Sequence, residues 1–179
     1  RHVGRWNEED FRFKTWDIEE KHHSNAAVYM LMDVSGSMTT GKKYIAKTFF
    51  FWMVRFLRLK YKNVETIFIA HDTEAEVVLE KDFFGLSQGG GTRCSSAYSV
   101  ARQHINAHHP PAVWNVYLFH FSDGDNLSYD NATCKALVEE LLDMGCNMIG
   151  YGEIRYRDDA SFYGWTGQSA YTPSSLQHA

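Results

Sequence analysis

The feature that most constrains the fold is an uninterrupted apolar run, Ala26-Ala27-Val28-Tyr29-Met30-Leu31-Met32, which leads directly into an aspartate, Asp33. A strand that is buried on both faces gives such a run, whereas a strand with one solvated face alternates polar and apolar residues. Strands of this kind occur in parallel sheets that are covered by helices on both sides. The run therefore predicts a central strand of an α/β domain.

The chain after this run alternates between strand-like and helix-like segments. Further strands are predicted at 64–70, 75–79, 114–121 and 146–154, and helices at 42–61, 95–107 and 131–144. The connection between the strands at 64–70 and 75–79 is too short for a crossover, so it predicts an antiparallel hairpin at a sheet edge. We expect a three-layer α/β/α, Rossmann-like domain with a mostly parallel central sheet and one antiparallel edge strand.

The helix predicted at 42–61 carries apolar residues around most of its circumference. Helical spacing assigns its buried face to Ile45, Phe49, Trp52, Met53, Phe56 and Leu57. Lys43 falls on the opposite, basic side, which Phe51 interrupts, and we expect an aromatic N-terminal arm to pack against Phe51. For the helix at 131–144, Asp130 is predicted to be the N-cap and Gly145 the C-terminal stop.

Three regions are expected along the chain. Residues 1–25 form the aromatic arm, which packs on the domain, residues 26–155 form the α/β domain, and residues 156–179 form an irregular tail, read as a truncated final helix or strand. The chain opens on an arginine rather than a methionine, so we expect a piece of a longer protein.

The composition argues against several classes of function. Eighteen Lys+Arg against 22 Asp+Glu give a formal net charge of -4, without the basic excess that nucleic-acid binding requires. The apolar stretches fall short of the ~20 residues that a membrane span needs. Three cysteines without CxxC spacing indicate a reducing compartment, and Cys94, which has no His and carboxylate nearby in sequence, is expected to be structural. We expect a cytoplasmic protein without nucleic-acid or membrane partners.

Small oxygen-bearing residues occupy three predicted loops. Two of these loops follow strands and one opens a helix, and the carboxyl ends of parallel strands meet at one edge of a sheet. Oxygen donors without nitrogen or sulfur suit a hard cation, Mg²⁺ first and then Mn²⁺ or Ca²⁺. The predicted metal ligands are Asp33, Ser35, Ser37, Thr92 and Asp123.

Other polar residues near these loops have two interpretations. Asp125 and Asn126 either hydrogen bond to the metal ligands or cap the helix that follows, and we favour capping. The pair His108-His109 lacks the spacing of a zinc site and is expected to be solvated. His120 lies within an apolar strand and is expected to be a hydrogen-bonded core residue.

The order Asp33-x-Ser35-x-Ser37, then Thr92, then Asp123 resembles the metal-ion-dependent adhesion site of von Willebrand factor A domains. This resemblance implies the von Willebrand factor A fold. That fold normally ends with a further helix and strand, of which the sequence has no convincing version.

More narrowly, the chain resembles the bacterial YeaH/YhbH family. The similar runs are 24–26, 32–38, 68–75 and 122–126, within a similarity that covers about residues 8 to 155. This resemblance implies a cytoplasmic protein linked to stress, stationary phase or sporulation, whose genes commonly neighbour a PrkA-type serine protein kinase.

The leading hypothesis is a metal-dependent protein-interaction module rather than an enzyme. Because only Asp33 and Asp123 offset the charge of a divalent ion, the ion can accept an Asp or Glu carboxylate from a partner. One alternative is a metal-assisted hydrolase or phosphatase, in which Asp125 or His71 acts as the base. Another is a scaffold whose metal site is vestigial.

Overall fold

The structure is a computed structural model that describes residues 25–87 and 89–155. One sheet holds five strands in the order β3-β2-β1-β4-β5. The strands are β1 (Asn25–Asp33), β2 (Asn63–His71), β3 (Ala75–Val78), β4 (Asn115–Ser122) and β5 (Met148–Glu153). All neighbours pair in parallel except β3, which is antiparallel to β2. The predicted α/β class, with its mostly parallel sheet and antiparallel edge strand, is confirmed.

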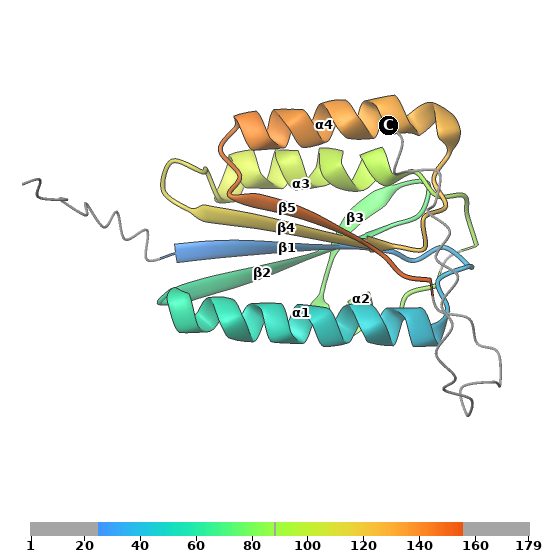
Figure 1. Ribbon diagram of the computed structural model, residues 1–179, viewed down its shortest axis with the longest axis horizontal. Coiled ribbons are helices and arrows are strands. Elements are labelled where there is room, and N and C mark those ends of the chain that lie inside the picture. The colour runs from blue at the N-terminus through green and yellow to red at the C-terminus, as the bar shows by residue number, and fades with distance from the viewer. Residues whose placement is uncertain (1–24, 88, 156–179) are drawn as a thin grey trace, which may run out of the picture.

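Helices cover both faces of the sheet, as Figure 1 shows. On one face lies α1 (Thr40–Lys60) together with α2 (Glu80–Phe83), a short helix that the sequence pattern did not indicate. On the other face lie α3 (Cys94–His108) and α4 (Asn131–Asp143), and a 3-10 turn (Ser128–Asp130) precedes α4. Two apolar cores result, one on each side of the sheet.

The central strand β1 fixes where a site can form. Every residue of β1 after Asn25 is buried, as the apolar run predicted. The chain leaves β1 through α1 to reach β2 on one side, and it later enters β4 on the other side from α3. The carboxyl ends of β1 and β4 therefore flank a topological switch point, where α/β sheets form their binding crevices.

The face that α1 buries overlaps the predicted one only in part. The helix buries Lys43, Ala46, Phe50 and Leu57, whereas Trp52 and Phe56 are 61% and 53% exposed. The prediction is correct for Leu57, which is buried, and Phe49 and Met53 are partly buried against the core. Apolar residues surround this helix, so two overlapping faces satisfy the helical period, and the buried face is rotated away from the predicted one. Lys43 is accommodated because its Nζ donates to the carbonyl of Leu86 at 2.6 Å.

The residue predicted to cap α4 caps the neighbouring helix instead. Asp130 stands at the N-terminus of α4 but makes no capping bond there. Its carboxylate accepts hydrogen bonds from the backbone N–H of Ser95, at 2.9 Å, and from the hydroxyl of the same residue, in the first turn of α3. Gly145 follows α4 with a φ of 100°, which agrees with its predicted role as a stop signal.

None of the helices in the described part of the chain combines the length and the hydropathy of a membrane-spanning helix. The predicted arm, residues 1–25, and the predicted tail, residues 156–179, lie outside the described residues apart from Asn25. The packing of the arm against Phe51 lies outside them as well.

Candidate functional site

The loop after β1 gathers the first three predicted ligands. Asp33 is fully buried, and its Oδ1 accepts a hydrogen bond from the backbone N–H of Ser35 at 2.8 Å. The hydroxyl oxygens of Ser35 and Ser37 lie 3.1 Å apart. Ser35 is buried and Ser37 is exposed, so the loop leads from the core to the surface. Alternate side chains of this loop therefore meet, as the D-x-S-x-S spacing predicted.

The end of β4 joins the first loop through Ser122, which was not among the predicted metal ligands. The hydroxyl of Ser122 donates to Asp33 Oδ2 at 3.0 Å, so both oxygens of that buried carboxylate are hydrogen bonded. The backbone N–H of Gly124, which has a φ of 92°, lies 3.3 Å from the same hydroxyl. The available signal was the position of Ser122, directly before Asp123 at the end of a strand.

A lysine links Asp123 to the first loop. The Nζ of Lys42, in the first turn of α1, donates to Asp123 Oδ2 at 2.9 Å and to the carbonyl of Ser37 at 2.8 Å. Burial raises the pKa of Asp123, but hydrogen bonds from Ser37 and Lys42 outweigh it and hold that pKa below its ordinary value. The two loops thus present an ionised carboxylate that already attracts a cation. Lys42 was not among the predicted site residues.

Thr92 lies buried in the loop that leads into α3. Its carbonyl accepts from the N–H of Leu127 at 3.1 Å, and the N–H of the next residue, Arg93, donates to the carbonyl of Asp72 at 2.7 Å. A Cβ on Gly90 would come within 2.5 Å of Asp72 Oδ2, so glycine allows this close approach. Backbone contacts thus hold Thr92 between the loops that follow β2 and β4.

The two residues after Gly124 have different surroundings. Asp125 has an exposed side chain, and its backbone N–H lies 3.4 Å from Asp123 Oδ1. Asn126 accepts from the backbone N–H of Cys94 at 3.1 Å through its side-chain oxygen. Asn126 therefore caps α3 and not, as was predicted, α4, the helix that follows it.

A second group of side chains lies beneath Asp33. His71 pairs with Asp33 in the register of β1 and β2. The Nε2 atoms of His71 and His120 are 2.7 Å apart, and His120 Nδ1 lies 2.9 Å from the hydroxyl of Tyr98. One ligand atom from each of His71, Cys94 and His120 lies within 4.8 Å of the other two, so this buried group could bind a metal.

No local sequence pattern indicates this group, because its histidines come from two different strands, β2 and β4. Cys94 has no histidine near it in the sequence, but in the folded chain His71 and His120 lie close to it. Burial lowers the pKa of His71 and of His120, and it raises the pKa of Cys94. These shifts favour the neutral form of all three side chains.

Of the other predictions about histidines, some are correct and one is wrong. His120 is a hydrogen-bonded core residue, as predicted. His108 is exposed, but His109 is only 3% exposed, so its predicted solvation is wrong. Its Nδ1 lies 2.7 Å from the Tyr29 hydroxyl and its Nε2 lies 3.0 Å from a carboxylate oxygen of Glu65. Two polar partners from the sheet account for its burial.

Comparison with protein families matches residues 2–171 to the family described as "Protein of unknown function (DUF444)". The chain is 55% identical over 146 residues to a UPF0229 protein of Halalkalibacterium halodurans. These 146 residues cover 82% of this chain and 37% of that protein. It is 53% identical over 148 residues to a UPF0229 protein of Bacillus cereus, covering 83% of this chain and 38% of that one. The chain thus spans less than two-fifths of the length of these relatives.

Two solved structures are similar to the chain at low sequence identity. One is a von Willebrand factor type A protein from Catenulispora acidiphila, with a TM-score of 0.44, 16% identity and coverage of 74% of this chain and 39% of that one. The other is proximal thread matrix protein 1 from the mussel byssus, with a TM-score of 0.46, 14% identity and coverage of 72% and 37%. The fold class follows from the strand order and pairing alone.

Proposed function

We propose that this chain, which belongs to the DUF444 family, is a metal-dependent protein-interaction module. The bound ion is Mg²⁺, with Mn²⁺ or Ca²⁺ as substitutes, and it takes an Asp or Glu carboxylate from a partner protein. The ligands are Asp33, Ser35, Ser37, Thr92 and Asp123. One observation carries the proposal: the loops after β1 and β4 form a single hydrogen-bonded group of oxygen donors at the switch point of the sheet.

The donor set fits a small, hard cation. Adjacent corners of a Mg²⁺ octahedron with metal–oxygen distances of roughly 2.0–2.1 Å are about 2.9 Å apart. The hydroxyl oxygens of Ser35 and Ser37 are 3.1 Å apart, close to that spacing. Asp33 accepts from the Ser35 backbone N–H with Oδ1 and from the Ser122 hydroxyl with Oδ2, so it supplies negative charge and fixes the backbone of the loop that carries Ser35.

The charges around the site favour an anionic partner. Two carboxylates, those of Asp33 and Asp123, balance the ion, and the ammonium of Lys42 adds one positive charge beside them. The site with its ion therefore carries a net charge of about +1, by the ordinary ionisation states of these groups. Since Ser37 is exposed, an outside carboxylate can approach from that side of the loop.

Part of the geometry weighs against the hydrolase alternative. His71, one of its two proposed bases, is 1% exposed and its Nε2 contacts His120 Nε2 at 2.7 Å. A general base must come within hydrogen-bonding reach of the water it activates. A turnover screen of phosphoesters and esters with Mn²⁺ separates the two functions, because the interaction module predicts no turnover above that of the Asp123→Ala variant.

The interaction is tested by capture from a native bacterial lysate with the 179-residue chain as bait, followed by binding assays with the purified partner. We expect binding in Mg²⁺ that disappears with excess chelator and with Asp123→Ala. Asp125→Ala is the matched control, because its exposed side chain belongs to the same loop. Acidic-to-amide substitutions in the partner should identify one carboxylate whose loss removes binding.

Binding that persists in chelator, or that Asp123→Ala leaves unchanged while the protein stays folded, contradicts the proposal. The PrkA-type kinase that the family resemblance implies is the first partner to purify and test. A role in a stress or sporulation pathway is part of the same proposal.

A further inference from the structure

We propose that His71, Cys94 and His120 form a second metal site, which takes a transition metal of the zinc type. The residues come from the end of β2, the start of α3 and the end of β4, and all three are buried. Two imidazole nitrogens and one thiol sulfur are the donors that Zn²⁺ prefers, whereas Mg²⁺ prefers oxygen. This site is independent of the carboxylate-binding function proposed above.

The atoms are close to the spacing that such an ion requires. In a tetrahedral zinc site with Zn–N of about 2.0–2.1 Å and Zn–S of about 2.3 Å, the nitrogens lie roughly 3.3 Å apart and sulfur lies about 3.6 Å from each. The two Nε2 atoms are 2.7 Å apart, and the ligand atoms of all three residues lie within 4.8 Å of one another. Side-chain movements of about 1 Å would therefore bring the group to ligand geometry.

The hydrogen bonds of the two rings differ at Nδ1, the nitrogen that would not bind the ion. His71 Nδ1 is buried and has no hydrogen-bond partner among the described residues, and an ion held by His71 Nε2 would not supply one. In contrast, His120 Nδ1 lies 2.9 Å from the Tyr98 hydroxyl. Ligating histidines usually hydrogen bond through the ring nitrogen that does not bind the metal. Tyr98 therefore fixes the ring of His120 with its Nε2 toward His71, and a bound ion would replace the contact between the two Nε2 atoms.

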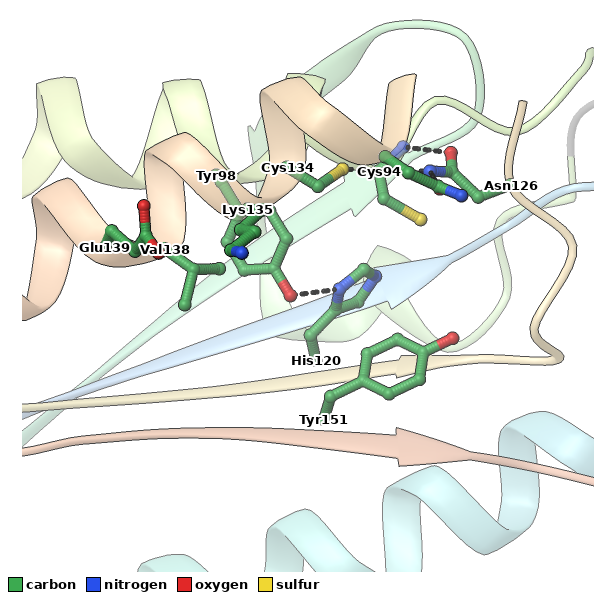
Figure 2. A pocket seen from close by; sticks show the side chains of 10 residues that line it. Cys94, Tyr98, His120, Asn126, Cys134, Lys135, Val138, Glu139 and Tyr151 are labelled. Carbon is green, nitrogen blue, oxygen red and sulfur yellow. Dashed lines mark hydrogen bonds between the residues drawn. The ribbon is translucent and has the colours of Figure 1, made fainter. Parts of the chain in front are cut away.

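A cavity gives access to the group. It has a volume of about 400 Å³, and Cys94, Tyr98, His120 and Tyr151 are among its lining residues. Figure 2 shows the Cys94 and His120 side chains facing this space, with the Tyr151 ring beside them. Three protein donors leave one tetrahedral position free, as in zinc sites that bind water or a substrate. The cavity can supply the water or small ligand for that position.

Cobalt titration of the untagged 179-residue chain, under reducing conditions, tests the site. Co²⁺ bound by a thiolate gives a sulfur-to-metal charge-transfer band, and we expect one band that saturates at one ion per chain and is displaced by Zn²⁺. Cys94→Ser should abolish the band. Cys134→Ser is the matched control, since Cys134 lines the same cavity outside the proposed ligand group, and it should keep the band.

Direct ligands should matter at least as much as their hydrogen-bond partners, whose loss costs about 10–100-fold in metal affinity. We therefore expect His71→Gln and His120→Gln each to weaken Zn²⁺ binding by at least about 100-fold, with circular dichroism confirming that they fold. Asp123→Ala should keep the cobalt band, which separates this site from the oxygen site. Cobalt binding without a sulfur band overturns the proposal, because it means that no thiol binds the metal. A band that survives Cys94→Ser also overturns it, because another cysteine then supplies the sulfur.

Discussion

Lys42 shows how a single side chain can set the affinity of the oxygen site. Its ammonium contacts Asp123 Oδ2 at 2.9 Å and the Ser37 carbonyl at 2.8 Å, so it occupies oxygens that a metal ion would also attract. Only 14% of its side chain and 5% of that of Asp123 are exposed. The lysine is therefore a tethered cation that competes with the ion and, once the ion is bound, adds positive charge for an acidic partner.

Replacing this lysine should strengthen metal binding. Two unit charges 4 Å apart interact by about 1 kcal/mol in water, and a divalent ion doubles the repulsion. After salt screening, we expect Lys42→Met to raise Mg²⁺ affinity about tenfold in calorimetric titration. Lys60→Met, at the far end of α1, is the control and should change nothing. An unchanged or weaker affinity for Lys42→Met would mean that the lysine positions Asp123 for the metal.

The glycine at position 152 is required by its neighbour on the next strand. A Cβ there would overlap the ring of Phe121, whereas a Cβ on Gly36 would meet nothing within 4 Å. Overpacking a core typically costs about 1–3 kcal/mol. We expect Gly152→Ala to lower the free energy of unfolding by that amount in urea titration, while Gly36→Ala stays within about 0.5 kcal/mol of the wild type. Equal stability of both variants would contradict the strand pairing of β4 and β5.

At the level of elements, the loop after β4 holds the start of α3. Asn126 and Asp130 accept from the N–H groups of Cys94 and Ser95, which the helix itself leaves without partners. Asp130 also accepts from the thiol of Cys134 at 3.1 Å, so it joins α3 to α4. The loop that carries Asp123 is thus anchored to the two helices on that face of the sheet.

Removing this cap should destabilise the domain in a pH-dependent way. Burial raises the pKa of Asp130, but hydrogen bonds, chiefly from Ser95, outweigh it and hold that pKa below the ordinary value of 3.8. A carboxylate with a lowered folded-state pKa stabilises the fold above its unfolded pKa, and this stability is lost as the pH falls through the folded-state value.

We expect Asp130→Ala to lower the free energy of unfolding by about 1–2 kcal/mol at pH 7, and the gap to narrow below about pH 4. Urea titrations across this range measure it. Asp143→Ala, at the exposed end of α4, is the control and should stay within about 0.5 kcal/mol of the wild type. If the difference in free energy of unfolding between Asp130→Ala and the wild type stayed constant down to acidic pH, the ionised Asp130 carboxylate would not be the stabilising cap.

The sequence predicted the elements better than the faces they bury. Strand positions were accurate because the buried runs around Val28 and Leu118 read as continuous apolar segments. The buried face of α1 was predicted only in part, because apolar residues surround the helix and packing against the sheet decides between the alternatives. The cap Asp130 was assigned to the wrong helix because it acts across the fold on Ser95 rather than along its own helix.

The oxygen site was only partly predictable for a related reason. Asp33, Ser35 and Ser37 share one loop, so local spacing was enough to bring them together. Lys42 and the group formed by His71, Cys94 and His120 depend on which strands are neighbours, and no local pattern encodes that order. Long-range contacts of this kind follow from the topology of the sheet.

For the whole molecule, metal binding and stability are linked. An ion that binds only the folded chain stabilises it by RT ln(1 + [L]/Kd), about 2.7 kcal/mol when the ion is at 100 times its Kd. We expect the melting temperature to rise with Mg²⁺ concentration, and the rise to be lost in Asp123→Ala. Asp125→Ala should keep it. A rise of equal size in Asp123→Ala would assign the stabilising ion to another place on the chain.

The most direct test of the central claim is a crystal structure of the 179-residue chain with Mn²⁺, located by its anomalous scattering. The account predicts a peak between the loops after β1 and β4, within about 2.5 Å of the Ser35 and Ser37 hydroxyl oxygens and of Asp123, with Lys42 displaced from that carboxylate. Crystals saturated with Mn²⁺ that show no peak there, while Lys42 keeps its contact with Asp123, would contradict it.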